Sequence, residues 1–178
     1  MKEMKEYTIP FVGLKVGQHK YDFNLDKKFF EHFEYDEFHQ VDLSLKVVLD
    51  KKPNMLEIDL SFEGSVNVSC DRTNEPFDLA LNGNYHYVVK FGQEQDDMHD
   101  ELVILPHGAY QVNIQQQVYE SIVLALPSKR IHPGIAEGTL ESDVLKQLEA
   151  LKPNGTDQDQ SDSVDPRWDG LKKLLTDK

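Results

Sequence analysis

The sequence has little cysteine and no long apolar run, and each absence narrows what the protein can be. A single cysteine, Cys70, occurs in 178 residues, so no disulfide can form within the chain and a reducing compartment is favoured. No uninterrupted apolar stretch approaches the roughly 20 residues that a membrane-spanning helix requires. The opening residues, MKEMKEYTIPF, lack the apolar segment of a secretory signal. We therefore expect no membrane partner and no export.

Residues that carry catalysis or bind cofactors are also scattered. The ten glycines form no loop that could cradle a phosphate, and the seven histidines form no HExxH pair or cysteine–histidine cluster. Ser128 lacks a nucleophile-elbow context, and the acidic segment Gln93–Glu101, expected to be a solvated loop, lacks the EF-hand spacing. Cys70 is interpreted as a small buried residue, because no general base is placed for a nucleophilic role. We therefore predict no catalytic residue, no cofactor and no metal site.

The charge balance is strongly acidic, at −13 with an isoelectric point near 4.9. Such a surface repels phosphate, because affinity for nucleic acid depends on cations that displace counterions. A basic protein partner remains compatible with it. Lys129, Arg130 and His132 form the one local basic cluster in the body of the sequence. Two readings stay open: these cations match the negative end of a helix, or they contact a phosphate backbone.

Alternating apolar and polar residues predict a sheet of several strands. Short strands are expected within 7–25, a long hairpin over 41–70 with its turn at 50–54, a further long strand over 77–91, and a short one over 102–105. Gly64 marks a bulge or a bend. Asp26 is expected to cap a short helix that places Phe29, Phe30 and Phe33 in the core. Short connections favour antiparallel pairing, and closure into a barrel is left open.

One amphipathic helix is predicted over 113–126. Asn113 supplies a side-chain oxygen for the first turn, apolar residues then recur every fourth position from Ile114 to Leu126, and Pro127 ends the helix. This helix is expected to cover the apolar face of the sheet, which gives an α+β fold. Glu120 lies beside the apolar stripe, and we expect either a rim position or an ion pair with Arg72 that fixes helix to sheet.

The C-terminal third is predicted to be segmented. The sequence favours an α+β domain over 1–136, an amphipathic helix over 137–151 with Thr139 as its cap, a disordered acidic linker over 152–164, and a docking helix over 165–178. Asp165 and Pro166 are helix-start signals, and Trp168 and Leu171 begin a small apolar face. A short helix after a linker is not stable alone, so it must dock on its own chain or on a partner.

Three short motifs in this order resemble the YceD family, bacterial proteins with plastid relatives that are linked to accumulation of large-subunit ribosomal RNA. They are a strand that ends in Cys70-x-Arg72, a helix that reads YExIxLALP over 119–127 with His132 shortly after it, and the C-terminal Asp-Pro-Arg-Trp at 165–168. The similarity is greatest to the Bacteroidota branch. Many relatives have a second cysteine where this chain has Thr73, so a CxxC metal or redox role is not transferred.

The resemblance implies a non-enzymatic factor of large ribosomal subunit biogenesis in the bacterial cytoplasm. The gene of that family commonly neighbours one for a small basic protein of the large subunit. We therefore expect binding of a basic ribosomal protein or assembly factor, and the alternative is direct binding of rRNA through the basic cluster, with help from Lys172 and Lys173. The candidate partner-binding residues are Arg72, Glu120, Lys129, Arg130, His132, Arg167, Trp168 and Leu171.

Overall fold

A computed structural model describes residues 4–92, 102–140 and 142–151 of the chain. The chain divides into two compact units, Met1–Leu140 and Glu141–Lys178. The first unit contains the helices η1 (Lys5–Tyr7), α1 (Lys27–Glu31), α2 (Gln115–Leu124) and α3 (Pro133–Glu137). Its strands are β1 (Thr8–Pro10), β2 (Gly17–Leu25), β3 (Gln40–Lys51), β4 (Met55–Ser69), β5 (Pro76–Phe91), β6 (Leu102–Leu105) and β7 (Gln111–Asn113).

Five strands form the main sheet in the order β2–β3–β4–β5–β6, and β1 pairs with β7 in a second, two-stranded sheet. The first four strands of the main sheet are antiparallel, but β6 runs parallel to β5. The expectation of a purely antiparallel sheet was therefore wrong at this edge. It assumed short connections throughout, whereas residues 92–101 separate β5 from β6, a longer link than a hairpin needs.

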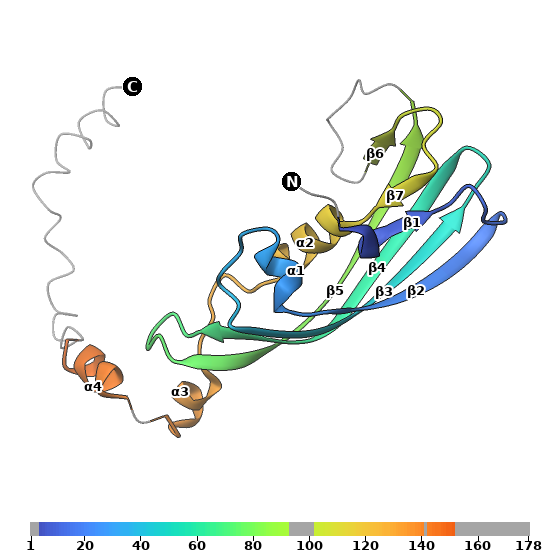
Figure 1. Cartoon of the computed structure of the whole chain (residues 1–178). Coiled ribbons are helices and arrows are strands. Elements are labelled where there is room, and N and C mark those ends of the chain that lie inside the picture. Colours follow the sequence, from blue (N-terminus) through green and yellow to red (C-terminus); the bar gives the residue numbers. More distant parts are fainter. Residues whose placement is uncertain (1–3, 93–101, 141, 152–178) are drawn as a thin grey trace, which may run out of the picture. The chain divides into compact units, whose positions relative to one another are not determined.

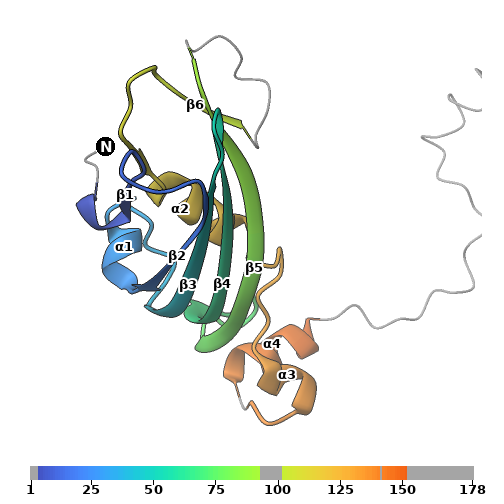
Figure 2. The same ribbon diagram turned by 90° about the vertical axis from the view of Figure 1, so that its right-hand side faces the viewer.

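Among the described residues of the first unit, helices and a strand pair cover one face of the main sheet and leave the other face open (Figures 1 and 2). The helices α1 and α2 and the β1–β7 pair lie on the same face, and the side chains that β3 and β4 direct toward them are buried. The mixed α+β fold is confirmed. Closure into a barrel is not confirmed, since β2 and β6 end the strand order among the described residues. Nor is α2 confirmed as the one main helix that covers the sheet, because α1, α2 and the β1–β7 pair together cover this face.

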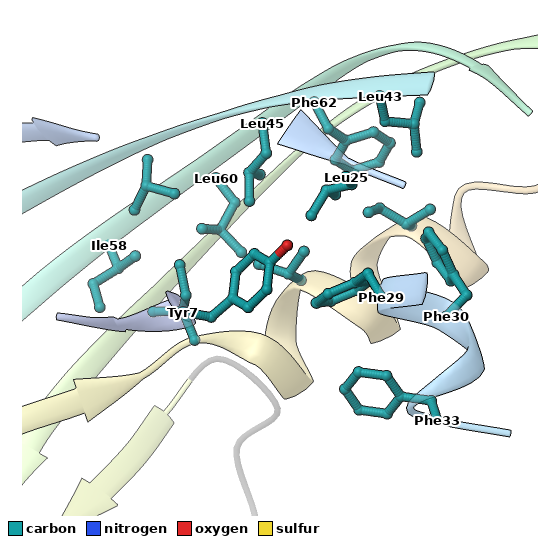
Figure 3. Close-up of a cluster of buried hydrophobic side chains, with 14 of the residues drawn as sticks. Tyr7, Leu25, Phe29, Phe30, Phe33, Leu43, Leu45, Ile58, Leu60 and Phe62 are labelled. Atoms are coloured by element: carbon teal, nitrogen blue, oxygen red, sulfur yellow. The ribbon is translucent and has the colours of Figure 1, made fainter. Parts of the chain in front are cut away.

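Aromatic side chains of α1 fill the space between the helices and the sheet, as predicted. Phe29 and Phe30 are 1% and 0% exposed, and the Tyr7 ring packs edge-on against Phe29 with their centroids 4.8 Å apart. Figure 3 shows these rings facing leucines and Ile58 from the sheet. Asp26 occupies the N-cap position of α1 without a side-chain hydrogen bond, so its expected capping bond is not formed. Burial of these rings provides much of the driving force for folding.

Gly64 lies within the continuous strand β4, and the register contains no bulge there. Its φ of 153° is one that residues with a side chain rarely adopt, and a Cβ atom there would lie 2.1 Å from the Asp42 carbonyl oxygen. The register with Leu43 on one side and Leu81 on the other continues through this residue without an inserted position. The glycine therefore lets β3 approach β4 closely at this position.

The helix predicted over 113–126 forms over the shorter range Gln115–Leu124, and its N-cap residue is Ile114 and not the predicted Asn113. The Asn113 side-chain oxygen accepts a hydrogen bond from the Gln115 backbone N–H at 2.9 Å, although Asn113 itself belongs to β7. The apolar stripe Ile114, Val118 and Ile122 is 0% exposed. The helix ends at Leu124, short of Pro127, which constrains the residues before it.

The second unit is described over residues 142–151 and contains α4 (Asp143–Ala150). Its N-cap is Ser142 and not the predicted Thr139, whose backbone N–H instead donates to the Gly134 carbonyl near the end of α3. On α4, Val144 and Leu148 are 42% and 43% exposed. The predicted acidic loop at 93–101, the linker at 152–164 and the docking helix at 165–178 lie outside the described residues, and the proposed domain boundaries remain predictions.

Candidate functional site

Arg130 connects three segments of the first unit, and we call this group of Arg130, Glu37 and Asp71 the Arg130 junction. Its guanidinium contacts Glu37 at 2.5 Å and Asp71 at 3.4 Å. The Arg130 backbone N–H also donates to the Asp71 carboxylate at 2.6 Å, and the Asp71 N–H donates to the Arg130 carbonyl at 2.8 Å. The junction therefore ties the segment after α2 to the β4–β5 turn and to the segment before β3.

The electrostatics of the junction follow from these contacts. The hydrogen bond with Glu37 and the charges of Glu37 and Asp71 raise the pKa of Arg130, although partial burial opposes them. Nearby, burial, the charge of Glu37 and a hydrogen bond with it raise the pKa of Tyr35 to about 12. The guanidinium stays charged, and its charge is balanced locally by two carboxylates.

Cys70 and His132, which lie far apart in the sequence, meet beside this junction. The His132 backbone N–H donates to the Cys70 sulfur at 3.3 Å, and the His132 ring Nδ1 accepts from the Gly134 N–H at 3.0 Å, which caps α3. Burial raises the pKa of the Cys70 thiol, but hydrogen bonds from His132 and Thr73 outweigh it, so the net pKa is lowered. Cys70 is only 2% exposed. The backbone amide of His132, and not its ring, makes the contact with Cys70. This contact therefore indicates a structural link between the β4–β5 turn and the segment after α2.

The expected ion pair between Arg72 and Glu120 is not formed. Arg72 lies in the exposed turn before β5, whereas Glu120 lies on α2 beside Asn84 and Tyr85. Eight strand residues separate those two places, roughly 25 Å at the usual rise per residue. The Gln116 side chain donates to Glu120 Oε1 at 2.9 Å instead. The arginine that joins the segment after the main helix to the sheet is Arg130, for which the sequence left a charge match to the helix end and a contact with phosphate as alternatives.

The predicted basic cluster is only partly available to a ligand. Arg130 is paired and the His132 ring is engaged, as described above. Lys129 and Arg72 are exposed, and the hydrogen bonds between Asp71 and Arg130 place these two cations on neighbouring positions of one surface. Neither forms an ion pair with any residue that the structure describes. Of the cations in the described ranges around this site, Arg72 and Lys129 thus remain without an ion pair, where the sequence suggested a larger patch.

A second feature, which we call the α2–β5 groove, was not predicted. It has a volume of about 660 Å³ and lies between the C-terminal half of α2 and the middle of β5. A Cβ atom at Gly83 would lie 2.5 Å from the Phe62 ring, so the ring occupies the space that glycine leaves and forms the floor. Leu124 is 83% exposed at the rim. The lining residues are Phe62, Gly83, Asn84, Tyr85, Glu120, Ser121, Leu124 and Ala125.

One sequence signal could have located the groove. The predicted strand over 77–91 contains the sequence Asn82-Gly83-Asn84, and all three residues lie inside β5. A glycine within a strand often marks a close approach by another group, and here that group is the cross-strand Phe62, which pairs with Gly83 in the register. The helix α3 was likewise missed, although Pro133 at its start and Gly138 just past its end are typical boundary residues.

The open face of the main sheet is polar and rich in carboxylates. His86 contacts Asp59 at 2.7 Å, and Lys52 pairs with Glu57. The alternation of the strands directs more acidic than basic side chains to this face. The acidic residues are Asp22, Asp42, Asp50, Glu57, Asp59, Glu63 and Asp78, and the lysines of the same strands and face are Lys20, Lys46 and Lys90.

Among the described residues, no group of three or more histidine, cysteine, aspartate or glutamate side chains is placed to hold a metal ion. No helix in the described ranges is long and apolar enough to cross a membrane. The candidate residues Arg167, Trp168 and Leu171 lie outside those ranges. The structure therefore bears on Arg72, Glu120 and the 129–132 cluster, and not on the C-terminal candidates.

Comparison with known proteins adds one finding. Neither the curated proteins nor the solved structures contain a match to this chain. The sequence profile of a family described as large ribosomal RNA subunit accumulation protein YceD matches residues 58–175, more than half of the chain. This chain belongs to the YceD family. The matched segment begins in β4 and includes both partners of the Cys70–His132 contact.

Membership in the YceD family implies a role in the accumulation of large-subunit ribosomal RNA, and with it an interaction with ribosomal components. The description names accumulation and no chemical reaction.

Proposed function

We propose that this YceD protein acts without catalysis in large-subunit biogenesis, by binding a basic ribosomal protein or assembly factor in the bacterial cytoplasm. The net charge of −13 favours a cationic partner and opposes extended contact with RNA. A chaperone of this kind keeps a basic protein from non-specific RNA contacts before assembly. Among the candidate residues, Glu120 offers a carboxylate to such a partner, and Trp168, with Leu171 and Arg167 beside it, offers an aromatic anchor.

The state of Arg130 is the observation that carries this proposal. Arg130 is the centre of the basic cluster, yet Glu37 and Asp71 both contact its guanidinium. A phosphate that approached it would meet two carboxylates and would have to displace them. The junction thus supports a structural role for Arg130 and weakens the case for an RNA-binding surface there.

Direct binding of rRNA is the second candidate, because Arg72 and Lys129 are exposed on neighbouring positions. Two cations release few counterions, so the salt dependence of RNA binding should be shallow. Charge reversal at Lys129 distinguishes protein binding from direct rRNA binding more clearly than charge reversal at Arg130. A glutamate at position 130 would face Glu37 and Asp71 and would disturb the fold itself.

The proposal is tested by titrating the full-length protein with individual purified proteins of the large subunit, and with large-subunit rRNA, at about 50 and 200 mM salt. We expect at least one basic protein to bind, and its Kd to rise several-fold at the higher salt concentration. We expect Lys129→Glu and Arg72→Glu to leave that binding unchanged, with Lys46→Glu on the open face as a matched control. Absence of protein binding, together with RNA binding that Lys129→Glu abolishes, would refute the proposal in favour of the second candidate.

A further inference from the structure

In the part of the chain that the structure describes, one edge of β5 has no strand partner along part of its length. β5 pairs with β4 from Pro76 to Lys90, but with β6 only from Val88 to Phe91. The segment after α2 passes beside the first part of β5 on its way to the Arg130 junction (Figure 2). The stretch Asn82–Tyr87 lies between these two neighbours, with α2 beside it.

The register of the sheet shows which backbone groups point away from β4. Cys70 N–H donates to the Glu75 carbonyl, and hydrogen-bonded positions alternate in an antiparallel ladder, so the odd-numbered residues of β5 bond to β4. The N–H and C=O groups of Asn82, Asn84 and His86 therefore face the other way. Within the described residues, no backbone hydrogen bond joins these three to another segment. A row of unpaired backbone groups is a template for another strand.

The α2–β5 groove lies directly beside this edge, since Asn84 and Tyr85 belong to both. A strand added along Asn82–His86 would direct alternate side chains toward the Phe62 floor and the exposed Leu124. Glu120 is the one ionisable residue among the described residues of the lining, apart from Tyr85. Its Oε1 accepts a hydrogen bond from the Gln116 side chain, and the Glu120 side chain is exposed at the surface. The site therefore offers main-chain groups, an apolar slot and one negative charge.

We propose that an extended segment of the basic protein partner adds to β5 as a strand at Asn82–His86, with an apolar side chain in the α2–β5 groove and a lysine or arginine on Glu120. The stretch is about 16 Å long, which suits roughly five extended residues. In strand addition the main-chain hydrogen bonds supply affinity and the side-chain pocket supplies selectivity. The proposal rests on the proposed function and names where and how the partner binds.

The other edge of the sheet is a less suitable template. β2 ends the strand order there and carries the exposed Lys20, and a lysine on an edge strand discourages further pairing. The stretch Asn82–Tyr87 contains neither lysine nor arginine. Charge complementarity also favours the β5 edge, because a cationic segment would meet Glu120 and no described basic residue in the groove.

The first test compares Leu124→Glu with Val16→Glu in the full-length protein. Leu124 and Val16 are 83% and 69% exposed, so each substitution adds the same charge at the surface without opening the core. The probe is the large-subunit protein that binds the wild-type chain most tightly in the titration above. We expect Leu124→Glu to raise its Kd at least about tenfold, and Val16→Glu to leave it within twofold. Glu120→Gln should weaken binding less than Leu124→Glu does. The loss of affinity that Glu120→Gln causes should be smaller at high salt.

The second test addresses the backbone. Asn84→Pro removes an N–H that faces the free edge and not β4, a position where proline is tolerated in edge strands, whereas Asn84→Ala removes only the side chain. We expect the proline variant to lose binding and the alanine variant to keep it. Amide exchange measured by NMR gives an independent result, because the Asn84 and His86 amides should become protected when the partner binds.

The possible outcomes are distinct. If the partner binds but Leu124→Glu and Asn84→Pro bind as well as wild type, or the edge amides gain no protection, strand addition at β5 is refuted while the proposed function stands. If no basic large-subunit protein binds the wild-type chain, both are refuted. If Asn84→Pro does not fold, the affinity of Leu124→Glu and the amide exchange data still test strand addition at β5.

Discussion

Replacing Arg130 by methionine removes the guanidinium but keeps most of the apolar stem. The side chain is 26% exposed and makes two ion pairs, to Glu37 and Asp71. Partly exposed pairs of this kind contribute about 0.5–1 kcal/mol each. We therefore expect Arg130→Met to lower the free energy of unfolding by about 1–2 kcal/mol. The backbone hydrogen bond from Arg130 to Asp71 does not depend on the side chain and should remain.

Urea unfolding followed by circular dichroism measures this loss, and a double-mutant cycle with Glu37→Gln isolates the pair. We expect a coupling energy of up to about 1 kcal/mol. Lys129→Met, at an exposed neighbour without an ion pair to a described residue, is the control and should change stability by less than about 0.5 kcal/mol. The reasoning is refuted if Arg130→Met has wild-type stability and at the same time loses affinity for large-subunit RNA.

Three further predictions concern the fold around the site. The Tyr87 hydroxyl is buried and has no hydrogen-bond partner among the described residues, so Tyr87→Phe should preserve or raise stability by up to about 1 kcal/mol in thermal unfolding, and a clear loss would reveal a hidden partner. Burial and nearby carboxylates raise the pKa of Tyr7 to about 12, so its contribution to stability is complete below pH 10 and is lost as pH rises toward 12; a urea midpoint that stays constant over that window would contradict this. Gly64→Ala should cost at least about 2 kcal/mol, because its Cβ would meet the Asp42 carbonyl, and an unchanged unfolding midpoint would exclude this close approach of β3 to β4.

The main elements of the fold were predictable because their patterns are local. Strict alternation over β3 and β4 and the four-residue spacing on α2 each indicate one buried face, and the structure buries those faces. The parallel pairing of β6 was not predictable in this way. Strand direction depends on how the chain returns after a long connection, and no local pattern encodes that return.

The candidate site was harder to predict, because its contacts join residues distant in sequence. The sequence predicted an arginine–carboxylate link between the helix region and the sheet, with Arg72 and Glu120 as the two partners. Arg72 directly follows Asp71 in the sequence, and Glu120 lies on the helix that precedes Arg130, so charge and order alone cannot separate Arg72 from Arg130. The groove was not predicted, because the pairing of Gly83 with Phe62 becomes visible only once the register is known.

The central claim is that this YceD protein binds a basic large-subunit protein and uses its acidic surface to do so. The most direct measurement is the Kd of the full-length chain for each purified large-subunit protein, and for large-subunit rRNA, at about 50 and 200 mM salt. We predict tight, salt-sensitive binding of at least one basic protein and weak binding of the RNA. Tight binding of the RNA that depends on Lys129 and Arg72, without affinity for any of the proteins, would contradict the claim.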